Sequence, residues 1–154
     1  MYNLRKATIK DAQLLFGWTN EEEVRAGAII KKRIEWDEHI HWLKGKLQNS
    51  QSYIYILTDD KNTDIGVVRF DKDDDFFNIS YSIDKKNRKK GMGLLILQLG
   101  IHIILETEPH CNFKASVQID NIASNKIFGK LGFQLVKTEV MNEYVFNVYC
   151  KDGN

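Results

Sequence analysis

The segment over residues 78–106 constrains the fold most, because three different patterns follow one another within it. Apolar and polar residues alternate up to Ile83, which predicts a strand. A basic loop with Gly91 and Gly93 comes next, and a long apolar helix follows it to about Thr107. The unpaired backbone N–H groups and the positive dipole end of a helix N-terminus favour anions. We therefore predict a phosphate-binding loop in front of a helix that is buried on most sides.

Length and charge are those of one ordinary globular domain. The chain has 154 residues and a net charge of +1, and 43% of its residues are hydrophobic. This length fits one domain over residues 1–154. The balanced charge gives no general attraction to nucleic acid or membrane. No apolar run approaches the roughly 20 residues that a membrane helix needs, and the first residues contain no signal-peptide pattern. We expect a cytoplasmic protein.

The cysteines and histidines suggest neither disulfide nor metal chemistry. Cys111 and Cys150 lie far apart and form no CxxC pattern, so we expect reduced thiols. His39 and His41 have no cysteine partners at the spacing of a zinc site. We therefore expect no metal.

Hydrophobic periodicity predicts the other elements. The expected strands cover 2–8, 52–58, 65–71, 77–83, 113–119, 133–139 and 144–149. The expected helices cover 11–18, 36–47, 91–107 and 121–130, with a further turn over 19–25 and a loop over 26–33. Three consecutive strands joined by turns, followed by two strand–helix units, predict an α/β (α+β) fold. Its central sheet is expected to be mixed and mostly antiparallel, with helices on both faces.

Two motifs in the second half resemble one enzyme family. Arg88-x-x-Gly91-x-Gly93 follows a strand, and N-x-x-S-x-x-x-F-x-K-x-G-F runs from Asn121 to Phe133. In this combination and order the chain resembles the GCN5-related N-acetyltransferases (GNAT). The resemblance covers almost the whole chain and implies a splayed strand pair that forms a cleft for acetyl-CoA as co-substrate.

The resemblance also implies cofactor-binding residues, whereas the alternative for the basic run is a solvated charged turn. The expected contacts are Ile83, Arg88, Lys89, Lys90, Gly91, Met92, Gly93, Asn121, Ser124 and Phe128. Many members carry a tyrosine at the position of Phe128, and its hydroxyl protonates the leaving thiolate. Phe128 cannot do so, which leaves Tyr81, a water or another hydroxyl as the acid, or no acid at all. Asn121 could also act as a simple helix N-cap.

The first half contains four short motifs, Trp18-x-Asn20, Val24-Arg25, His39-x-x-Trp42 and Val68-Arg69-Phe70-Asp71. In these motifs the chain resembles a bacterial subgroup that acetylates nucleotide-linked amino sugars on the route to nonulosonic acids such as pseudaminic acid. Ribosomal-protein and aminoglycoside acetyltransferases share part of this pattern. The resemblance suggests substrate-binding roles for Trp18, Asn20, Arg25, Trp42 and Arg69. Core packing of the tryptophans and an ion pair of Arg69 with Asp71 are the structural alternatives.

Three residues are candidates for the chemistry. A backbone N–H near Ile83 is expected to stabilise the oxyanion. His39 is the candidate base by its intrinsic pKa, with packing beside Trp36 and Trp42 or substrate stacking as the alternative. Ser80 lies on the polar face of the same strand, where no carboxylate is available. A water could also carry the proton.

The sequence thus predicts an acetyl-CoA-dependent N-acetyltransferase that acts on a primary amine of a small molecule, with a nucleotide-linked amino sugar as first choice. Acetylation of a protein N-terminus or an aminoglycoside is the second possibility. A non-catalytic acyl-CoA-binding module is a third. We expect a monomer or homodimer. We expect no nucleic-acid partner, because no stacking aromatics flank the basic run.

Overall fold

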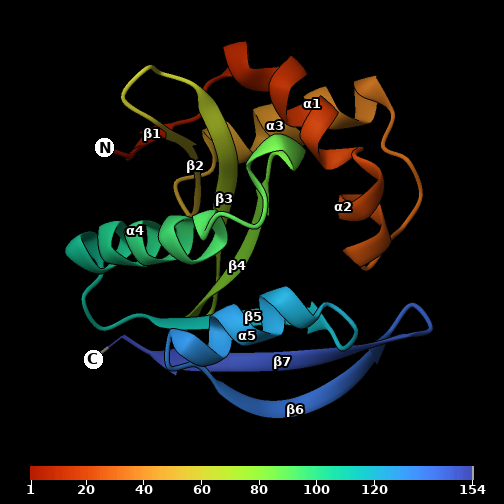
Figure 1. The fold of residues 1–154 in the computed structure, drawn as a ribbon, viewed down its shortest axis with the longest axis vertical. Helices are drawn as coiled ribbons and strands as arrows, with labels where there is room; N and C mark the ends of the chain where they lie inside the picture. Colours follow the sequence, from red (N-terminus) through yellow and green to blue (C-terminus); the bar gives the residue numbers. More distant parts are fainter. Residues whose placement is uncertain (154) are drawn as a thin grey trace.

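Seven strands form one sheet in the order β1-β2-β3-β4-β5-β7-β6 in the computed structural model, which describes residues 1–153 (Figure 1). The strands are β1 (Asn3–Lys6), β2 (Ser52–Thr58), β3 (Asp64–Asp73), β4 (Phe76–Ile83), β5 (Asn112–Gln118), β6 (Gln134–Met141) and β7 (Tyr144–Asp152). Strands β4 and β5 pair in parallel, and every other neighbouring pair is antiparallel. The predicted mixed, mostly antiparallel sheet is confirmed.

Five α-helices connect the strands. They are α1 (Ala12–Thr19), α2 (Glu22–Gly27), α3 (Trp36–Gln48), α4 (Met92–Thr107) and α5 (Ile122–Lys130), with short 3-10 turns at Ile9–Asp11 and Lys85–Asn87. The order of elements agrees with the prediction except for one additional helix, α2. Helix α2 is a separate helix, where the sequence predicted a turn that gives way to a loop at residue 26. It is short and has no buried residue, so hydrophobic periodicity gave no signal for it.

The sheet is covered on both faces, as alternation along β2 illustrates. Ile54 and Ile56 pack in a cluster with residues of α1 and α3. Tyr55 and Leu57 point to the other face, into a larger cluster that includes residues of α4 and α5. Side chains of successive strand residues point to opposite faces, so one strand serves both cores. Figure 1 shows α1 and α3 on one side of the first strands and α4 on the other.

Helix α4 lies close against the sheet, and Gly100 makes this possible. A Cβ atom at this position would lie 2.9 Å from the ring of Phe70 on β3. The exposed side of the helix carries a narrow polar stripe, in which His102 and Glu106 form an i,i+4 pair at 3.1 Å. The prediction of a helix that is mostly buried is therefore confirmed.

A polar cluster fixes the start of the chain. Thr8 and Asp11 form a capping box at the turn before α1. Arg5 binds both carboxylate oxygens of Asp11, at 3.0 and 2.8 Å, and also reaches Asp64. The hydrogen bonds from Arg5 lower the pKa of Asp11, so this carboxylate stays ionised. The cluster joins β1 to the first residue of β3.

None of the helices in residues 1–153 is long and apolar enough to cross a membrane.

Candidate active site

Strands β4 and β5 separate after a short parallel contact. They pair at three positions, Phe76 with Asn112, Phe77 with Phe113 and Asn78 with Lys114. Each strand then follows its other neighbour: β4 stays with β3 as far as Ile83, and β5 stays with β7 as far as Gln118. Among the described residues, the two strands make no pair beyond Asn78. One edge of β4 is thereby left open along the wedge between them, as the resemblance implied (Figure 1).

The backbone of Ile83 faces this wedge. Asp84 donates its N–H to the carbonyl of Ile65 at 2.8 Å, so the amide of residue 84 points to the β3 side. Hydrogen-bonding groups of successive strand residues point to opposite edges. The Ile83 N–H therefore points toward β5. The Ile83 carbonyl accepts a hydrogen bond from Arg88 Nε at 3.0 Å, outside the β3 ladder. An N–H in this position can bind a developing oxyanion.

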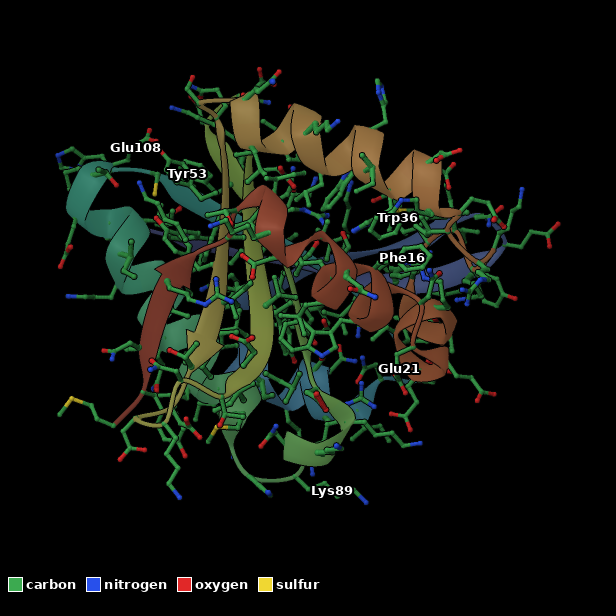
Figure 2. All side chains as sticks on the ribbon, turned by 90° about the horizontal axis from the view of Figure 1, so that it is seen from above. Phe16, Glu21, Trp36, Tyr53, Lys89 and Glu108 are labelled. Atoms are coloured by element: carbon green, nitrogen blue, oxygen red, sulfur yellow. The ribbon has the colours of Figure 1, made fainter. Side chains whose placement is uncertain are left out.

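The loop between β4 and α4 presents its backbone to the same end of the wedge. Lys89 and Gly91 both have left-handed backbone conformations, with φ values of 63° and 79°. Alternating left-handed residues turn successive N–H groups toward one point, an arrangement that binds anions. Helix α4 begins at Met92, so its first N–H groups add to this set. Figure 2 shows Lys89 on this loop, at the rim of the molecule.

A left-handed backbone conformation is unusual for a lysine, and contact of the backbone with a ligand would explain the strain at Lys89. A residue with a Cβ atom loses about 1 kcal/mol or more in this conformation. Such strain is commonly kept where a backbone must meet a ligand. The side chains of Lys89 and Lys90 are exposed, so their ammonium groups are available to a bound anion. Their predicted contact with a pyrophosphate, and that of Met92, stays a prediction.

Arg88 has a different place from the one predicted. Its guanidinium donates to Glu21 at 2.9 Å and to Glu23 at 2.8 Å, and the bond to the Ile83 carbonyl completes the set. The hydrogen bond between Arg88 and Glu21 raises the pKa of Arg88. The same bond lowers the pKa of Glu21. The side chain is therefore committed to protein partners and ties the loop to α2. Its expected role as a phosphate ligand is not supported.

The role of these two glutamates was missed from the sequence. The signal that could have revealed it is the acidic run 21–23, which is complementary to the basic run 85–90.

Gly93 is required for close packing at the start of α4. A Cβ atom here would lie 2.9 Å from Ile127 Cδ1 and 3.2 Å from Tyr81 Cε2. Its absence lets the first turn of α4 sit directly against α5 and β4. The sequence suggested that Gly93 lets the backbone approach a ligand, and the structure adds crowding from protein side chains.

On the α5 side, Asn121 and Ser124 meet a tyrosine from β4. Asn121 caps α5 by accepting the N–H of Ser124 at 3.2 Å, which is the cap expected from the sequence. The hydroxyls of Tyr81 and Ser124 lie 2.5 Å apart and link β4 to α5. Burial raises the pKa of Tyr81 above its ordinary value. This hydroxyl therefore keeps its proton at neutral pH.

Phe128 is a core residue. Its side chain is 2% exposed. The rings of Tyr81, Phe133 and Tyr149 surround it, with centroids 5.0 to 6.2 Å away. The prediction of direct cofactor contact by Phe128 is not supported, because the side chain is enclosed by protein.

His39 is unsuited to the predicted role of base. It is 2% exposed, and its Nε2–H donates to the carbonyl of Ala12 at 2.9 Å. Burial lowers its pKa. Its ring lies among Phe16, Trp36 and Trp42, and Figure 2 shows Phe16 and Trp36 side by side where α1 meets α3. His39 thus joins two helices, which is the packing alternative considered from the sequence.

Three residues near α2 that were predicted to bind substrate, Trp18, Asn20 and Arg25, form hydrogen bonds with other segments of the chain. Asn20 exchanges two hydrogen bonds with the backbone of Ile34, at 2.8 and 2.9 Å. Arg25 donates to the carbonyls of Thr19, Ile30 and Lys32. Trp18 donates to Asp84 at 3.3 Å and so reaches the end of β4. The polar groups of Asn20 and Arg25 have backbone partners, so their expected part in holding a substrate is not supported.

The other predicted acceptor-side residues lie together on the sheet face beneath α3. Arg69 Nε donates to Asp71 at 2.7 Å, and its NH2 group reaches the Ser80 hydroxyl at 3.3 Å. The guanidinium also lies 5.0 Å from the ring centroid of Trp42. The ion pair of Arg69 with Asp71 matches the structural alternative from the sequence, and it leaves the guanidinium committed to internal partners. Ser80 is exposed on this face, and its catalytic role stays a prediction.

A cavity of about 300 Å³ lies between α2 and the end of β5. It is lined by two carboxylates, from Glu23 and Asp120, together with Ala26, Gly27, Gln118 and Asn121. Because Asn121 also caps α5, the cavity adjoins the open end of the wedge. Glu23 is paired with Arg88 at 2.8 Å, and Lys31 donates to Gln118 at 3.0 Å. Asp120 is exposed at the mouth of the cavity and can attract a cation.

No group of three His, Cys, Asp or Glu side chains within residues 1–153 is arranged to hold a metal ion. Both cysteines are free thiols.

Comparison with known proteins agrees with this geometry. The acetyltransferase (GNAT) domain family matches residues 2–134. Spermidine N-acetyltransferase from Vibrio cholerae, solved with CoA and spermine, superposes with a TM-score of 0.90 at 12% identity and covers 99% of this chain and 95% of its own. No curated protein sequence matches significantly.

Two further structures have the same fold. The acetyltransferase from Salmonella typhimurium that modifies the N-terminal serine of ribosomal protein L7/L12 has a TM-score of 0.82 at 18% identity, covering 98% of this chain and 94% of its own. A putative phosphinothricin N-acetyltransferase has a TM-score of 0.85 at 18% identity, covering 100% and 99%. The family match spans most of the chain, and the chain therefore belongs to the GNAT family of acetyl-CoA-dependent acetyltransferases.

Proposed function

We propose that this chain transfers the acetyl group of acetyl-CoA to a primary amine of a small, positively charged molecule. The observation that carries the proposal is the wedge between β4 and β5, which has an anion-binding loop at one end and a cavity with two carboxylates beside it. The loop suits the pyrophosphate of the cofactor. The cavity suits the acceptor, because a cation is attracted to the exposed carboxylate of Asp120.

The proposed reaction is direct transfer. The acceptor nitrogen attacks the thioester carbonyl carbon, and the Ile83 N–H binds the oxygen that becomes negative. The carbon–sulfur bond then breaks, CoA leaves as a thiolate, and the nitrogen loses its extra proton to water. Burial raises the pKa of Tyr81, so its hydroxyl is protonated. It is the proposed donor to the thiolate, and it regains a proton from the water that took up the proton of the nitrogen.

The acceptor class follows from charge. A nucleotide-linked amino sugar, the first choice from the sequence, carries phosphates that need cationic partners. Arg25 and Arg69 were the candidates, and both are held by internal partners. The cavity instead offers the exposed carboxylate of Asp120, whereas its other carboxylate, from Glu23, is paired with Arg88. Three of the structural neighbours are spermidine or spermidine/spermine N-acetyltransferase structures, and their acceptors are cationic amines. We therefore favour a small cationic amine over the amino sugar.

An amine panel tests this assignment by release of the CoA thiol. We expect turnover with di- or polyamines to exceed turnover with nucleotide amino sugars, aminoglycosides and N-terminal peptides. Asp120→Asn should raise the KM for the amine about threefold to fivefold, which is the value of one exposed charge pair, and leave the KM for acetyl-CoA unchanged. Asp37→Asn removes an exposed carboxylate from the first turn of α3 and serves as the control.

Two outcomes would contradict the assignment. Faster turnover of a nucleotide amino sugar, with no effect of Asp120→Asn, would return the acceptor to the class predicted from the sequence. Thermal stabilisation by acetyl-CoA without turnover of any amine would favour a non-catalytic acyl-CoA-binding module.

A further inference from the structure

Gly66 on β3 lies directly behind Ile83, the residue whose backbone faces the wedge. The two residues are partners in the register of β3 with β4. The neighbouring pair is joined by a hydrogen bond from Asp84 to the carbonyl of Ile65. Pairs with and without such bonds alternate along an antiparallel ladder, and the Cα atoms approach most closely at the pairs without them. Gly66 therefore stands at a point of close approach to Ile83.

The space between the two strands at Gly66 is too small for a side chain. A Cβ atom here would lie 2.7 Å from the carbonyl oxygen of Ser82, 2.8 Å from Ile83 Cδ1 and 3.3 Å from Ile83 Cα. Two of these three atoms belong to the backbone, so a new rotamer of Ile83 would not relieve the crowding. Any residue other than glycine therefore requires the two strands to move apart.

A bulge in β3 helps to explain the close approach. Asp64 and Gly66 pair with consecutive residues of β2, so Ile65 between them is an extra residue. Bulges bend and twist a strand, and they are common next to active sites. Arg5 donates to Asp64 at 3.0 Å, which fixes β3 where the bulge begins. The position of β3 behind Ile83 is thus defined by contacts on its far side.

The two strands would respond differently to crowding at this point. Strand β3 is paired on both edges, with β2 and with β4. Strand β4 makes no pair with β5 beyond Asn78 in the part of the chain that the structure describes. Because the wedge-facing edge of β4 is unsupported at Ile83, β4 is the strand that moves. The movement carries Ile83 into the wedge.

We propose that Gly66 is a positioning residue for acetyl transfer, because its missing side chain sets the place of the Ile83 N–H in the wedge. The inference rests on the proposed function, in which this N–H binds the developing oxyanion. A Cβ atom 2.7 Å from a neighbour is about 0.7 Å short of ordinary contact at 3.4 Å. Misplacement of a reacting group by about 1 Å can cost about a hundredfold in rate. A side chain at residue 66 therefore impairs the transfer step.

Steady-state kinetics of Gly66→Ala test the proposal, with acetyl-CoA and the fastest amine of the panel described above. We expect kcat to fall about tenfold to a hundredfold. The KM values for both substrates should stay within about threefold of those of the natural chain, since the interaction that is lost belongs to the transition state. Thermal unfolding and acetyl-CoA binding establish that the variant is folded.

Gly100→Ala is the matched control. A Cβ atom at Gly100 is crowded to a similar degree, at 2.9 Å, but against the ring of Phe70 in the core. Overpacking there should lower the unfolding temperature and leave kcat close to the natural value. An unchanged kcat in a folded Gly66→Ala chain, or an equal loss of kcat in both variants, would overturn the proposal.

Two further variants keep the outcomes distinct. Should Gly66→Ala fail to fold, Gly66→Ala/Ile83→Val removes the contact with Cδ1 and keeps the contact with the Ser82 carbonyl. Its kcat should lie at least about threefold below that of Ile83→Val, and an equal kcat would overturn the proposal. An amide-to-ester replacement at position 83 separates the inference from the proposed function. A slow ester variant beside a fast Gly66→Ala chain contradicts the role of Gly66 alone, whereas a fast ester variant contradicts the oxyanion role of Ile83 and the inference with it.

Discussion

A Gly91→Glu variant is expected to bind acetyl-CoA at least about thirtyfold more weakly than the natural chain. Gly91 precedes α4 in a left-handed conformation with φ of 79°, and nothing lies within 4 Å of the position that a Cβ atom would occupy. The new side chain therefore has room, and its carboxylate faces the proposed pyrophosphate position. Two like charges about 4 Å apart repel by about 4 kcal/mol at an effective dielectric constant of 20. Half of this repulsion, about 2 kcal/mol, corresponds to thirtyfold weaker binding of acetyl-CoA.

Isothermal titration calorimetry measures this loss, and Gly45→Glu is the matched control. Gly45 lies on α3 and also has nothing within 4 Å of its Cβ position. It adds the same charge away from the loop and should leave acetyl-CoA binding unchanged. The left-handed glutamate itself costs about 1 kcal/mol of stability, which thermal unfolding would register. A folded Gly91→Glu chain with unchanged affinity would show that the pyrophosphate binds elsewhere.

An Ile83→Pro variant is expected to bind acetyl-CoA and to lose about a hundredfold to a thousandfold in kcat. Proline removes the N–H that faces the wedge, and one oxyanion donor is worth about this much. The ladder to β3 uses the neighbouring amide of Asp84, so it is retained. Ile83→Val trims the same buried side chain and keeps the N–H, so its kcat should stay within a few-fold of the natural value.

An amide-to-ester replacement at position 83 removes the same N–H without fixing the backbone. It should reproduce the loss in kcat. A folded proline or ester variant that turns over as fast as Ile83→Val would remove the Ile83 N–H from the mechanism.

The donor half of the site could be predicted largely from the sequence. The strand, the glycine loop and α4 are neighbours in the chain, and their signals are local: alternation, Gly91, and the apolar helix. The Asn121 cap is local as well. Such features depend on backbone chemistry that a short segment fixes by itself.

The acceptor half could not be predicted in the same way, because it depends on contacts between distant segments. The position of α2 against the loop decides whether Arg88 contacts a phosphate or Glu21. Helix α2 has no buried residue, so hydrophobic periodicity in the sequence does not predict it. The intrinsic pKa of His39 suggested a base, whereas its burial between α1 and α3 determines its actual environment. Arg25 likewise appears free in the sequence and is held by three backbone carbonyls in the fold.

Amide hydrogen exchange with and without acetyl-CoA tests the central claim most directly, because it reports on the loop and the wedge residue by residue. The cofactor should slow exchange at the amides of residues 89–94, at Ile83 and at the first turn of α5. These groups lie at the left-handed loop, the open edge of β4 and the Asn121 cap. Binding that leaves these amides unchanged, and protects another surface instead, would contradict the proposed site.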